Sequence, residues 1–368
     1  MKIIKLIINT NSQKYPIIIG SNILKYLSKI LNKNSIKFKK CLLVIDKNIP
    51  KKKISIIKKN LKNADVSVYF INATEVNKNQ NNTNKILKIL LEKNFSRQDC
   101  LISIGGGITG DIGGYAASLF KRGLQFINIP TTLLAQVDSS IGGKTGINTK
   151  YGKNLIGSFY QPKLVISETT FLKTLPKREL ICGYGEILKH SLISEKKFFK
   201  FLDKNLNKIL NLENSFIEKA IYESCKIKRK FVEKDEKEKN VRKFLNFGHT
   251  FGHAFEASLG FSKKLNHGEA VLLGMKSALN FSFKKKILQS QDYKIIKNHI
   301  QNFKLPYDLK KFFSLKNIDT ILSFMTKDKK NDSDKINLIL LKRIGVPIMK
   351  RNFNKKYLKS FLYRELVN

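Results

Sequence analysis

The first half of the chain alternates short apolar runs with longer stretches of helical spacing, and this alternation strongly restricts the possible folds. The apolar runs are rich in Ile and Val, as buried strands are, and lie at 41–46, 66–71, 100–107 and 125–130. The N-terminal segment 1–20, broken by Asn and Lys, is also expected to begin with a strand. Strands that alternate with helices form a parallel sheet, so the pattern predicts an α/β domain.

After Pro176 the strand signals largely vanish and helical spacing predominates. The clearest helical segments are 177–193, 215–233 and 268–283. The sequence TLPKREL at 174–180 combines a Pro with a new helix start, which indicates a domain boundary. We therefore expect residues 1–175 to form a Rossmann-like α/β domain, and residues 176–368 to form a mainly α-helical domain.

The chain is strongly basic, because 70 Lys and Arg residues against 28 Asp and Glu residues give a formal net charge of +42. Such a charge is compatible with nucleic-acid binding. The lysines, however, are spread along the whole chain together with abundant Ile and Asn, and runs such as 51–53 and 284–286 lack interleaved aromatic side chains. A solvated lysine surface explains this composition, so we expect no nucleic-acid partner, whereas attraction of an anionic substrate fits the charge.

Cysteine usage and hydropathy restrict the compartment. Four well-separated cysteines, Cys41, Cys100, Cys182 and Cys225, form neither a disulfide framework nor a Cys-x-x-Cys motif, so reduced thiols are expected. No stretch reaches the roughly 20 apolar residues that cross a bilayer, and the N-terminus lacks a small-residue cleavage site. We expect a cytoplasmic protein without a membrane partner.

A glycine-rich segment, LISIGGGITGDIGGYAASLFKRG, runs from the apolar strand near residue 101 into a helix. Glycines at such a turn let the backbone approach a pyrophosphate, and the helix that follows offers unpaired N–H groups and its positive dipole end. The same residues also serve tight turns for steric reasons alone. The spacing departs from G-x-G-x-x-G and therefore favours a variant nucleotide fold over a plain Rossmann dehydrogenase.

Charged and amide side chains follow among further glycines between residues 122 and 154. This stretch contains Arg122, Asp138, Lys144, Lys153 and Asn154. Lysines attract phosphate and carboxylate as mobile charges, Arg binds them through two hydrogen bonds, and Asp accepts hydrogen bonds from hydroxyl groups. An exposed basic loop is the simpler alternative, but the glycines favour a constrained backbone beside an anionic, hydroxylated ligand.

Three of the five histidines, His249, His253 and His267, fall within 19 residues. His249 and His253 are four residues apart and share a helix face, and His267 opens a later helical run after a loop. A catalytic zinc usually keeps three protein ligands, often His with a carboxylate, so an acidic residue should complete the set. The candidate carboxylates are Glu186, Glu256 and Glu269.

These segments together resemble the 3-dehydroquinate synthase family over nearly the whole chain. The matching stretches, in order, are GGGITGDIGGYAASLFKRG, IPTTLLAQVDSSIGGKTGIN, GKNLIGSFYQP, LKTLPKREL, GEILKH, NFGHTFGHAFE, LNHGEAV and the triplet Asp328, Lys329 and Lys330. The resemblance implies a sugar phosphate cyclase fold with an N-terminal nucleotide-binding domain and a C-terminal metal-binding domain.

The resemblance also implies roles for individual residues. As metal ligands it implies Glu186, His249 and His267, whereas helical spacing alone would have paired His249 with His253. As catalytic residues it implies Lys144, Lys189, Lys228, Arg242, Asn246 and His253, and as substrate-binding residues Arg122, Asp138, Lys153, Asn154 and Lys329. For NAD it implies Asp46, Asn48, Glu75, Lys78, Gly107, Ile108, Thr109, Gly110, Asp111, Thr131, Thr132, Phe171, Leu172, Lys173 and Thr174, with Lys144 and Lys153 also in reach.

The activity implied by the resemblance is that of a carbon–oxygen lyase acting on phosphates. The family converts 3-deoxy-D-arabino-heptulosonate 7-phosphate to 3-dehydroquinate and phosphate on the shikimate route to chorismate and aromatic amino acids. A ring hydroxyl is transiently oxidised by NAD, phosphate is eliminated, the hydride returns, and the opened ring closes by an intramolecular aldol step. We therefore expect NAD, zinc or cobalt, a phosphorylated sugar acid as the small-molecule substrate, and a homodimer.

One departure and two rival functions remain open. The family usually carries a Pro-Asp-Gly-Glu turn before its lysine, but residues 72–78 read NATEVNK and keep only Glu75 and Lys78, which leaves the loop geometry at the cofactor open. A metal-dependent polyol or alcohol dehydrogenase shares the glycine turn and the paired histidines, and it would release NADH. The many cations argue against a neutral alcohol, and a cyclase that makes another carbocycle fits better than a dehydrogenase.

Overall fold

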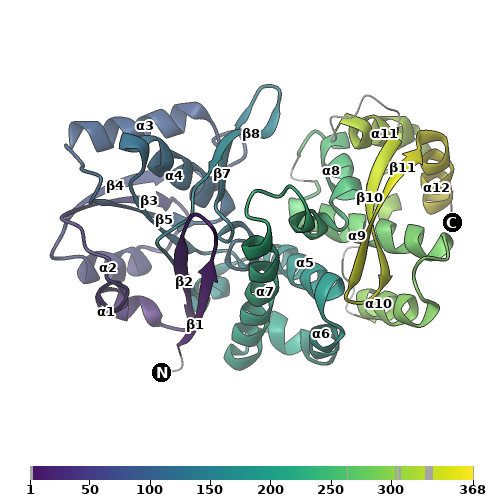
Figure 1. The fold of residues 1–368 in the computed structure, drawn as a ribbon, viewed down its shortest axis with the longest axis horizontal. Coiled ribbons are helices and arrows are strands. Elements are labelled where there is room, and N and C mark those ends of the chain that lie inside the picture. Colours follow the sequence, from purple (N-terminus) through teal and green to yellow (C-terminus); the bar gives the residue numbers. More distant parts are fainter. Residues whose placement is uncertain (1–2, 263, 303–304, 306–307, 328–334, 368) are drawn as a thin grey trace. The chain divides into compact units, whose positions relative to one another are not determined.

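The computed structural model describes residues 3–262, 264–302, 305, 308–327 and 335–367. The chain divides into two units, which are described separately (Figure 1). Unit 1 consists of Met1–Pro176 and Leu212–Lys237, and unit 2 consists of Lys177–Asn211 and Glu238–Asn368. The predicted division into residues 1–175 and 176–368 thus differs from the units in one respect, because residues 212–237 pack with the N-terminal half.

Among the described residues of unit 1, seven strands form one sheet in the order β1-β2-β9-β6-β5-β3-β4. The strands are β1 (Ile4–Asn9), β2 (Lys14–Gly20), β3 (Lys40–Asp46), β4 (Asp65–Ile71), β5 (Cys100–Gly105), β6 (Gln125–Pro130) and β9 (Leu164–Glu168). β1 pairs antiparallel with β2, and the other neighbours are parallel. The four predicted strands of the parallel sheet are confirmed as β3 to β6, and the N-terminal segment forms a β1–β2 hairpin.

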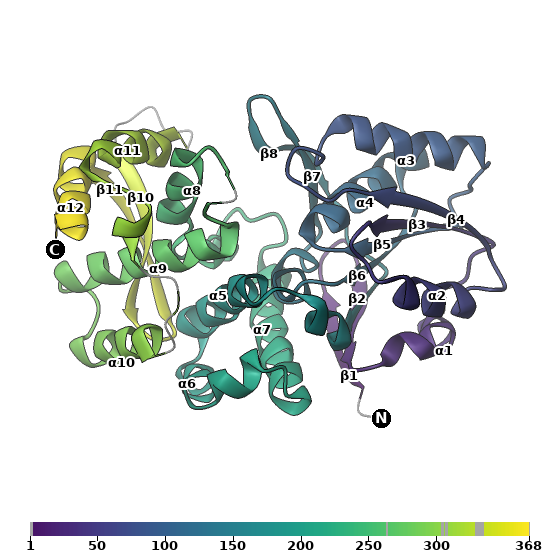
Figure 2. The same ribbon diagram turned by 180° about the vertical axis from the view of Figure 1, so that it is seen from behind.

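Helices cover both faces of this sheet (Figure 2). α1 (Leu27–Lys33) and α2 (Lys51–Asn60) share one apolar cluster with Leu43 and Ile45 of β3. α3 (Gln80–Glu92) and α4 (Gly107–Leu119) share the other cluster with Leu42 and Val44 of the same strand. Successive residues of a strand point to opposite faces, so β3 must be apolar throughout, which explains its continuous apolar run.

Two further elements complete unit 1. The hairpin of β7 (Lys144–Thr149) and β8 (Gly152–Phe159) packs on α4. α7 (Asn214–Lys234) packs against β1 and β2, where Glu233 accepts a hydrogen bond of 2.7 Å from the backbone N–H of Asn9. Arg229 donates to the carbonyl oxygen of Ile7 at 3.3 Å. These contacts explain why α7 belongs to unit 1 although it lies far along the sequence.

Unit 2 is mainly helical, as predicted, with a β-hairpin in addition. Its helices are α5 (Lys177–Ser194), α6 (Lys196–Leu210), α8 (His249–Ser258), α9 (His267–Lys284), α10 (Ser290–Asn302), α11 (Ile318–Lys327) and α12 (Lys355–Val367), and its strands are β10 (Lys335–Arg343) and β11 (Val346–Asn354). The largely buried helix α9 contacts α5, α8, α10 and β10 and forms the core of the unit. None of the described helices is both long and apolar enough to span a membrane.

Candidate active site

The glycine-rich turn lies where β5 ends and α4 begins. Gly106 is the N-cap of α4 and Gly107 its first residue. A Cβ on Gly106 would lie 3.2 Å from Cγ2 of Thr132, and a Cβ on Gly107 would lie 3.0 Å from Oγ of Ser139, so larger residues would crowd this helix start. A helix N-terminus with accessible N–H groups suits a pyrophosphate, and the turn therefore fits the phosphates of NAD.

Other residues predicted to bind NAD follow the ends of parallel strands of the same sheet. Asp46 and Asn48 follow β3, and Asp46 accepts the backbone N–H of Asn48 at 3.0 Å. Burial raises the pKa of the Asp46 carboxyl, although the hydrogen bonds from Asn48 act in the opposite direction. Thr131 and Thr132 follow β6, and the segment Phe171–Thr174 follows β9 in a 3-10 turn. Parallel strands end at one edge of the sheet, so these groups share the edge at which α/β folds bind nucleotides.

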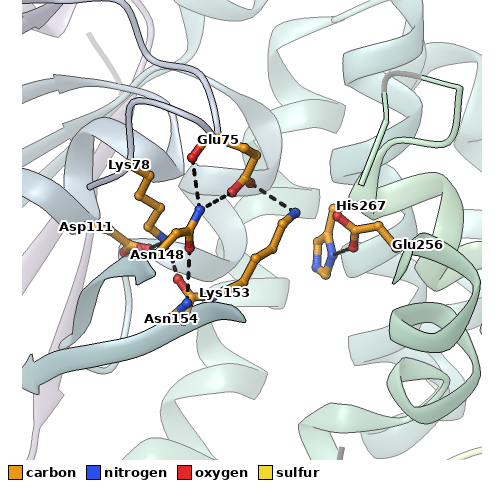
Figure 3. Close-up of polar contacts among 8 residues, drawn as sticks. All are labelled: Glu75, Lys78, Asp111, Asn148, Lys153, Asn154, Glu256 and His267. Carbon is orange, nitrogen blue, oxygen red and sulfur yellow. Dashed lines mark hydrogen bonds and ion pairs between the residues drawn. The ribbon is translucent and has the colours of Figure 1, made fainter. Parts of the chain in front are cut away.

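Lys78 connects the helix start to the β7–β8 hairpin (Figure 3). Its ammonium group forms an ion pair with Asp111 of α4 and donates to Oδ1 of Asn154 at 2.5 Å. Burial raises the pKa of Asp111, while the charge of Lys78 lowers it. Glu75 lies on the same segment, and its carboxylate is 3.5 Å from Nζ of Lys153. The structure thus brings Glu75, Lys78 and Asp111, which the resemblance implies for NAD, together with Lys153 and Asn154, which it implies for the substrate.

Asn148 joins this cluster and was not singled out from the sequence. Its side-chain amide donates to the carboxylate of Glu75 at 2.8 Å and to the carbonyl oxygen of Glu75 at 3.0 Å (Figure 3). Its side-chain oxygen accepts the backbone N–H of Asn154 at 3.1 Å. The residue lies inside a predicted polar loop, but its sequence neighbourhood carries no signal for these contacts.

The remaining predicted residues of unit 1 lie at three places. Lys144, Gly110 and Asp111 line one small cavity of about 10 Å³. Lys228 of α7 is buried, and its ammonium group donates to Oδ1 of Asp138 at 2.7 Å and to the carbonyl oxygen of Asp138 at 2.6 Å. Arg122 ends a 3-10 turn with an exposed side chain and a left-handed backbone, φ 64°. A cation held by two oxygens, as Lys228 is, needs little reorganisation to meet an anion.

The predicted histidines come together in unit 2. His249 and His253 lie on α8, and His267 is the first residue of α9. Ring centroids are 5.1 Å apart for His249 and His253, and 5.7 Å apart from each of these to His267. One ring nitrogen of each lies within 4.8 Å of those of the other two. The three imidazoles thus meet as a metal site requires.

Glycines bring α8 and α9 close enough for this arrangement. A Cβ on Gly252 of α8 would lie 2.8 Å from the carbonyl oxygen of Ala270, and a Cβ on Gly274 of α9 would overlap the carbonyl oxygen of Gly248. Gly248 precedes α8 with φ 81°, a conformation that favours glycine. Larger side chains would separate the helices and the histidines that they carry.

The structure distinguishes the three candidate carboxylates. Glu186 of α5 is 1% exposed, and its Oε1 lies 3.8 Å from Nε2 of His249. A carboxylate oxygen of Glu256 lies 3.0 Å from Nδ1 of His267, so Glu256 can hold the imidazole ring of a metal ligand without binding the metal itself. Glu269 instead caps α9 through the backbone N–H of Asn266 at 2.9 Å and also binds Arg178. Glu186 therefore completes the donor set best.

Predicted cations and amides of unit 2 lie on α5 and on the segment before α8. Lys189 forms a buried ion pair with Glu186, one helical turn away, which fixes the orientation of that carboxylate. Arg242 is 2% exposed, and Asn246 donates to Glu238 at 2.6 Å. Lys329 lies outside the described residues.

Comparisons with known proteins agree with these features. Residues 68–182 match the model of the 3-dehydroquinate synthase N-terminal domain, and residues 183–331 match that of the C-terminal domain. The chain is 63% identical over 366 residues to the 3-dehydroquinate synthase of Pelagibacter ubique strain HTCC1062, with 100% of each chain covered. It is 40% identical to that of Alkaliphilus metalliredigens strain QYMF, with 98% of this chain and 99% of the relative covered.

Solved structures give the same fold. A 2-deoxy-scyllo-inosose synthase complexed with carbaglucose-6-phosphate, NAD+ and Co2+ is similar at a TM-score of 0.85 and 25% identity, over 98% of this chain and 100% of that chain. A probable glycerol dehydrogenase from Sinorhizobium meliloti 1021 is similar at a TM-score of 0.65 and 14% identity, over 95% of this chain and 96% of that chain, which shows the fold alone. With both family domains and full-length relatives in agreement, the chain belongs to the 3-dehydroquinate synthase family.

Proposed function

We propose that this chain acts as a carbon–oxygen lyase that converts 3-deoxy-D-arabino-heptulosonate 7-phosphate to 3-dehydroquinate and phosphate, with NAD and zinc or cobalt as cofactors. The observation that carries the proposal is the cluster of His249, His253 and His267 with Glu186 in a member of this family. The similar 2-deoxy-scyllo-inosose synthase was solved with NAD+ and Co2+ together, which supports the same pair of cofactors here.

The donors of unit 2 fit a divalent metal. Imidazole nitrogens and a carboxylate are ligands that zinc and cobalt accept. We assign Glu186, His249 and His267 to the metal and His253 to the substrate. Glu256 would hold the ring of His267, because its carboxylate contacts the nitrogen at 3.0 Å. When bound, the metal supplies Lewis-acid polarisation of a ring hydroxyl, and NAD supplies a hydride acceptor that is regenerated within the turnover.

The cations and amides would hold the substrate through its charges. The phosphate and carboxylate of a sugar acid call for positive partners, which Arg122, Lys144, Lys153 and Arg242 can provide. Asp138 fixes the ammonium group of Lys228 through two hydrogen bonds, so this cation is already oriented before an anion arrives. We expect these side chains to stabilise the departing phosphate and to exclude water from it.

One experiment tests the reaction directly. Purified protein is mixed with NAD, zinc and the heptulosonate phosphate, and phosphate release, NADH absorbance and the cyclic product are followed together. Equal amounts of phosphate and 3-dehydroquinate without net NADH are expected, because the hydride returns to the substrate. NADH that accumulates with a simple polyol, without phosphate release, would instead establish the dehydrogenase. Another carbocycle as the product would identify a different cyclase.

Two expectations stay predictions, the homodimer that the resemblance implies and the cytoplasmic location inferred from the hydropathy. Sedimentation analysis of the purified protein tests the homodimer, since a homodimer has twice the chain mass of 42.3 kDa. Cell fractionation tests the cytoplasmic location. Neither outcome changes the chemistry proposed for the site residues.

A further inference from the structure

The segment at residues 72–78 departs from the usual turn of the family, so another interaction must hold Glu75 and Lys78 in place. The segment has local hydrogen bonds of its own. The backbone N–H of Asn77 donates to the carbonyl oxygen of Thr74 at 3.0 Å, and the side-chain amide of Asn77 donates to the backbone carbonyl oxygen of Asn72 at 2.9 Å. These bonds shape the turn but do not attach it to the rest of unit 1. The ammonium group of Lys78 attaches it to Asp111 of α4, and β7 adds a second attachment through Asn148.

The pairing of β7 with β8 is irregular at Asn148. Ile147 pairs with Ile156 and Thr149 pairs with Gly152, so β8 carries two extra residues opposite Asn148. The backbone N–H of Asn148 donates to the carbonyl oxygen of Lys78 at 2.7 Å. Irregular pairing of this kind often occurs beside active sites, where it re-aims side chains. Here it accompanies the contacts of Asn148 with the residues predicted to bind NAD.

The side chain of Asn148 then joins two groups of predicted site residues. Its amide nitrogen donates twice to Glu75, at 2.8 and 3.0 Å, and its amide oxygen accepts from the backbone N–H of Asn154 at 3.1 Å (Figure 3). Asn154 has a left-handed backbone, φ 55°, which is an unfavourable conformation that such a contact helps to hold. Lys153, its neighbour, pairs with the same Glu75 at 3.5 Å.

We propose that Asn148 is a positioning residue that couples NAD binding at Glu75 and Lys78 to the orientation of Lys153 and Asn154 toward the substrate. The inference rests on the proposed function, because that function gives these residues their roles. Only a primary amide of this length supplies donors for a carbonyl and a carboxylate together with an acceptor for an N–H group. A movement of Glu75 on cofactor binding is therefore transmitted to Lys153 and Asn154.

Two variants separate the donor bonds of the Asn148 amide to Glu75 from its acceptor bond with Asn154. Asn148→Ala removes the donor and the acceptor bonds together. We therefore expect the Kd for NAD and the KM for the heptulosonate phosphate each to rise about tenfold, as loss of one to two net hydrogen bonds implies. Asn148→Asp keeps the acceptor for Asn154 but sets a carboxylate against Glu75. It should raise the Kd for NAD more than the KM for the substrate. Asn84→Ala, which removes an exposed side-chain bond with Gln80 on α3, serves as the control.

The decisive measurements are NAD titration without substrate and hydrogen exchange of residues 144–159 with and without NAD. In the unchanged protein, NAD should slow exchange in this hairpin, and in Asn148→Ala the slowing should disappear while melting shows a folded protein. The proposal would be overturned if the variants kept the Kd for NAD, the KM for the substrate and the hydrogen exchange of the unchanged protein. It would also be overturned if the variants only contained less active protein, with a normal Kd and a normal KM. The aspartate variant gives the same test if the alanine variant does not fold. Failure of the unchanged protein to bind NAD would refute the proposed function instead.

Discussion

The close contact of α8 and α9 at Gly274 leads to a sharp prediction for Gly274→Ala. Within a helix, alanine normally stabilises relative to glycine by about 0.5–1 kcal/mol. Here the added Cβ would overlap the carbonyl oxygen of Gly248 and lie 2.6 Å from the backbone nitrogen of Gly252. Both neighbours are backbone atoms, which cannot rotate away, so α8 must move as a whole.

The expected cost follows from overpacking. Such insertions cost about 1–3 kcal/mol, so after the gain of about 0.5–1 kcal/mol in helix propensity we expect a net loss of roughly 1 kcal/mol in the free energy of unfolding. For a domain of about 150–250 residues this lowers Tm by roughly 2–4 °C. Because His249 and His253 lie on α8 and His267 lies on α9, the same movement should weaken zinc binding, by about 10–100-fold if it resembles the loss of an outer-shell partner.

Thermal unfolding and metal content after dialysis against a weak chelator test this reasoning. Gly260→Ala is the control, since its Cβ would meet nothing within 4 Å while its φ of 64° makes any side chain unfavourable by about 1–2 kcal/mol. The control should lose stability yet keep its zinc. A Gly274→Ala protein that is more stable than the unchanged chain, with full zinc content, would refute the account of the helix contact.

Three further outcomes are expected. His249→Ala should lose zinc and activity together, whereas His253→Ala should lose activity and keep zinc in elemental analysis, and zinc loss in both would make His253 a ligand. Burial lowers the pKa of His299 below its ordinary 6.5, although the charge of Asp203 acts in the opposite direction. The stabilising contribution of the neutral ring is therefore present above about pH 6.5 and falls as the pH drops. In His299→Asn the denaturant midpoint should depend less on pH between about pH 7 and 5. Burial raises the pKa of Cys182 to about 12, so this thiol should resist a disulfide reagent at pH 8 until the protein unfolds.

The parallel strands could be predicted from the sequence because a strand that is buried on both faces is a continuous apolar run. Leu42 and Val44 pack on one side of the sheet and Leu43 and Ile45 on the other, so no polar position interrupts β3. The β10–β11 hairpin was not predicted, although residues 338–341 form a continuous buried apolar run and Gly345 lies at the turn with φ 87°. A short apolar run cannot be told from a buried helix segment by periodicity, so within a helical half it is easily assigned to its surroundings.

The site residues divide in the same way. The three histidines could be grouped by their spacing, because helix geometry fixes which neighbours share a face. The choice among Glu186, Glu256 and Glu269 could not be made by spacing, because it depends on how α5 packs on α9. Asn148 was missed because its contacts accompany an irregularity in the β7–β8 pairing, and a two-residue shift in strand pairing leaves no trace in composition or periodicity.

The placement of α7 shows what periodicity leaves undecided. Its helical spacing was correctly predicted, and its buried residues include Ile217 and Ile221. An amphipathic pattern states that a face must be covered but does not name the covering element. Here β1 and β2 provide the cover, and the same docking brings Lys228 to Asp138, more than 80 residues earlier in the chain. The boundary after residue 175 therefore separates helical from mixed sequence, while Lys228, which we predict to be catalytic, belongs with the unit that carries the predicted NAD residues.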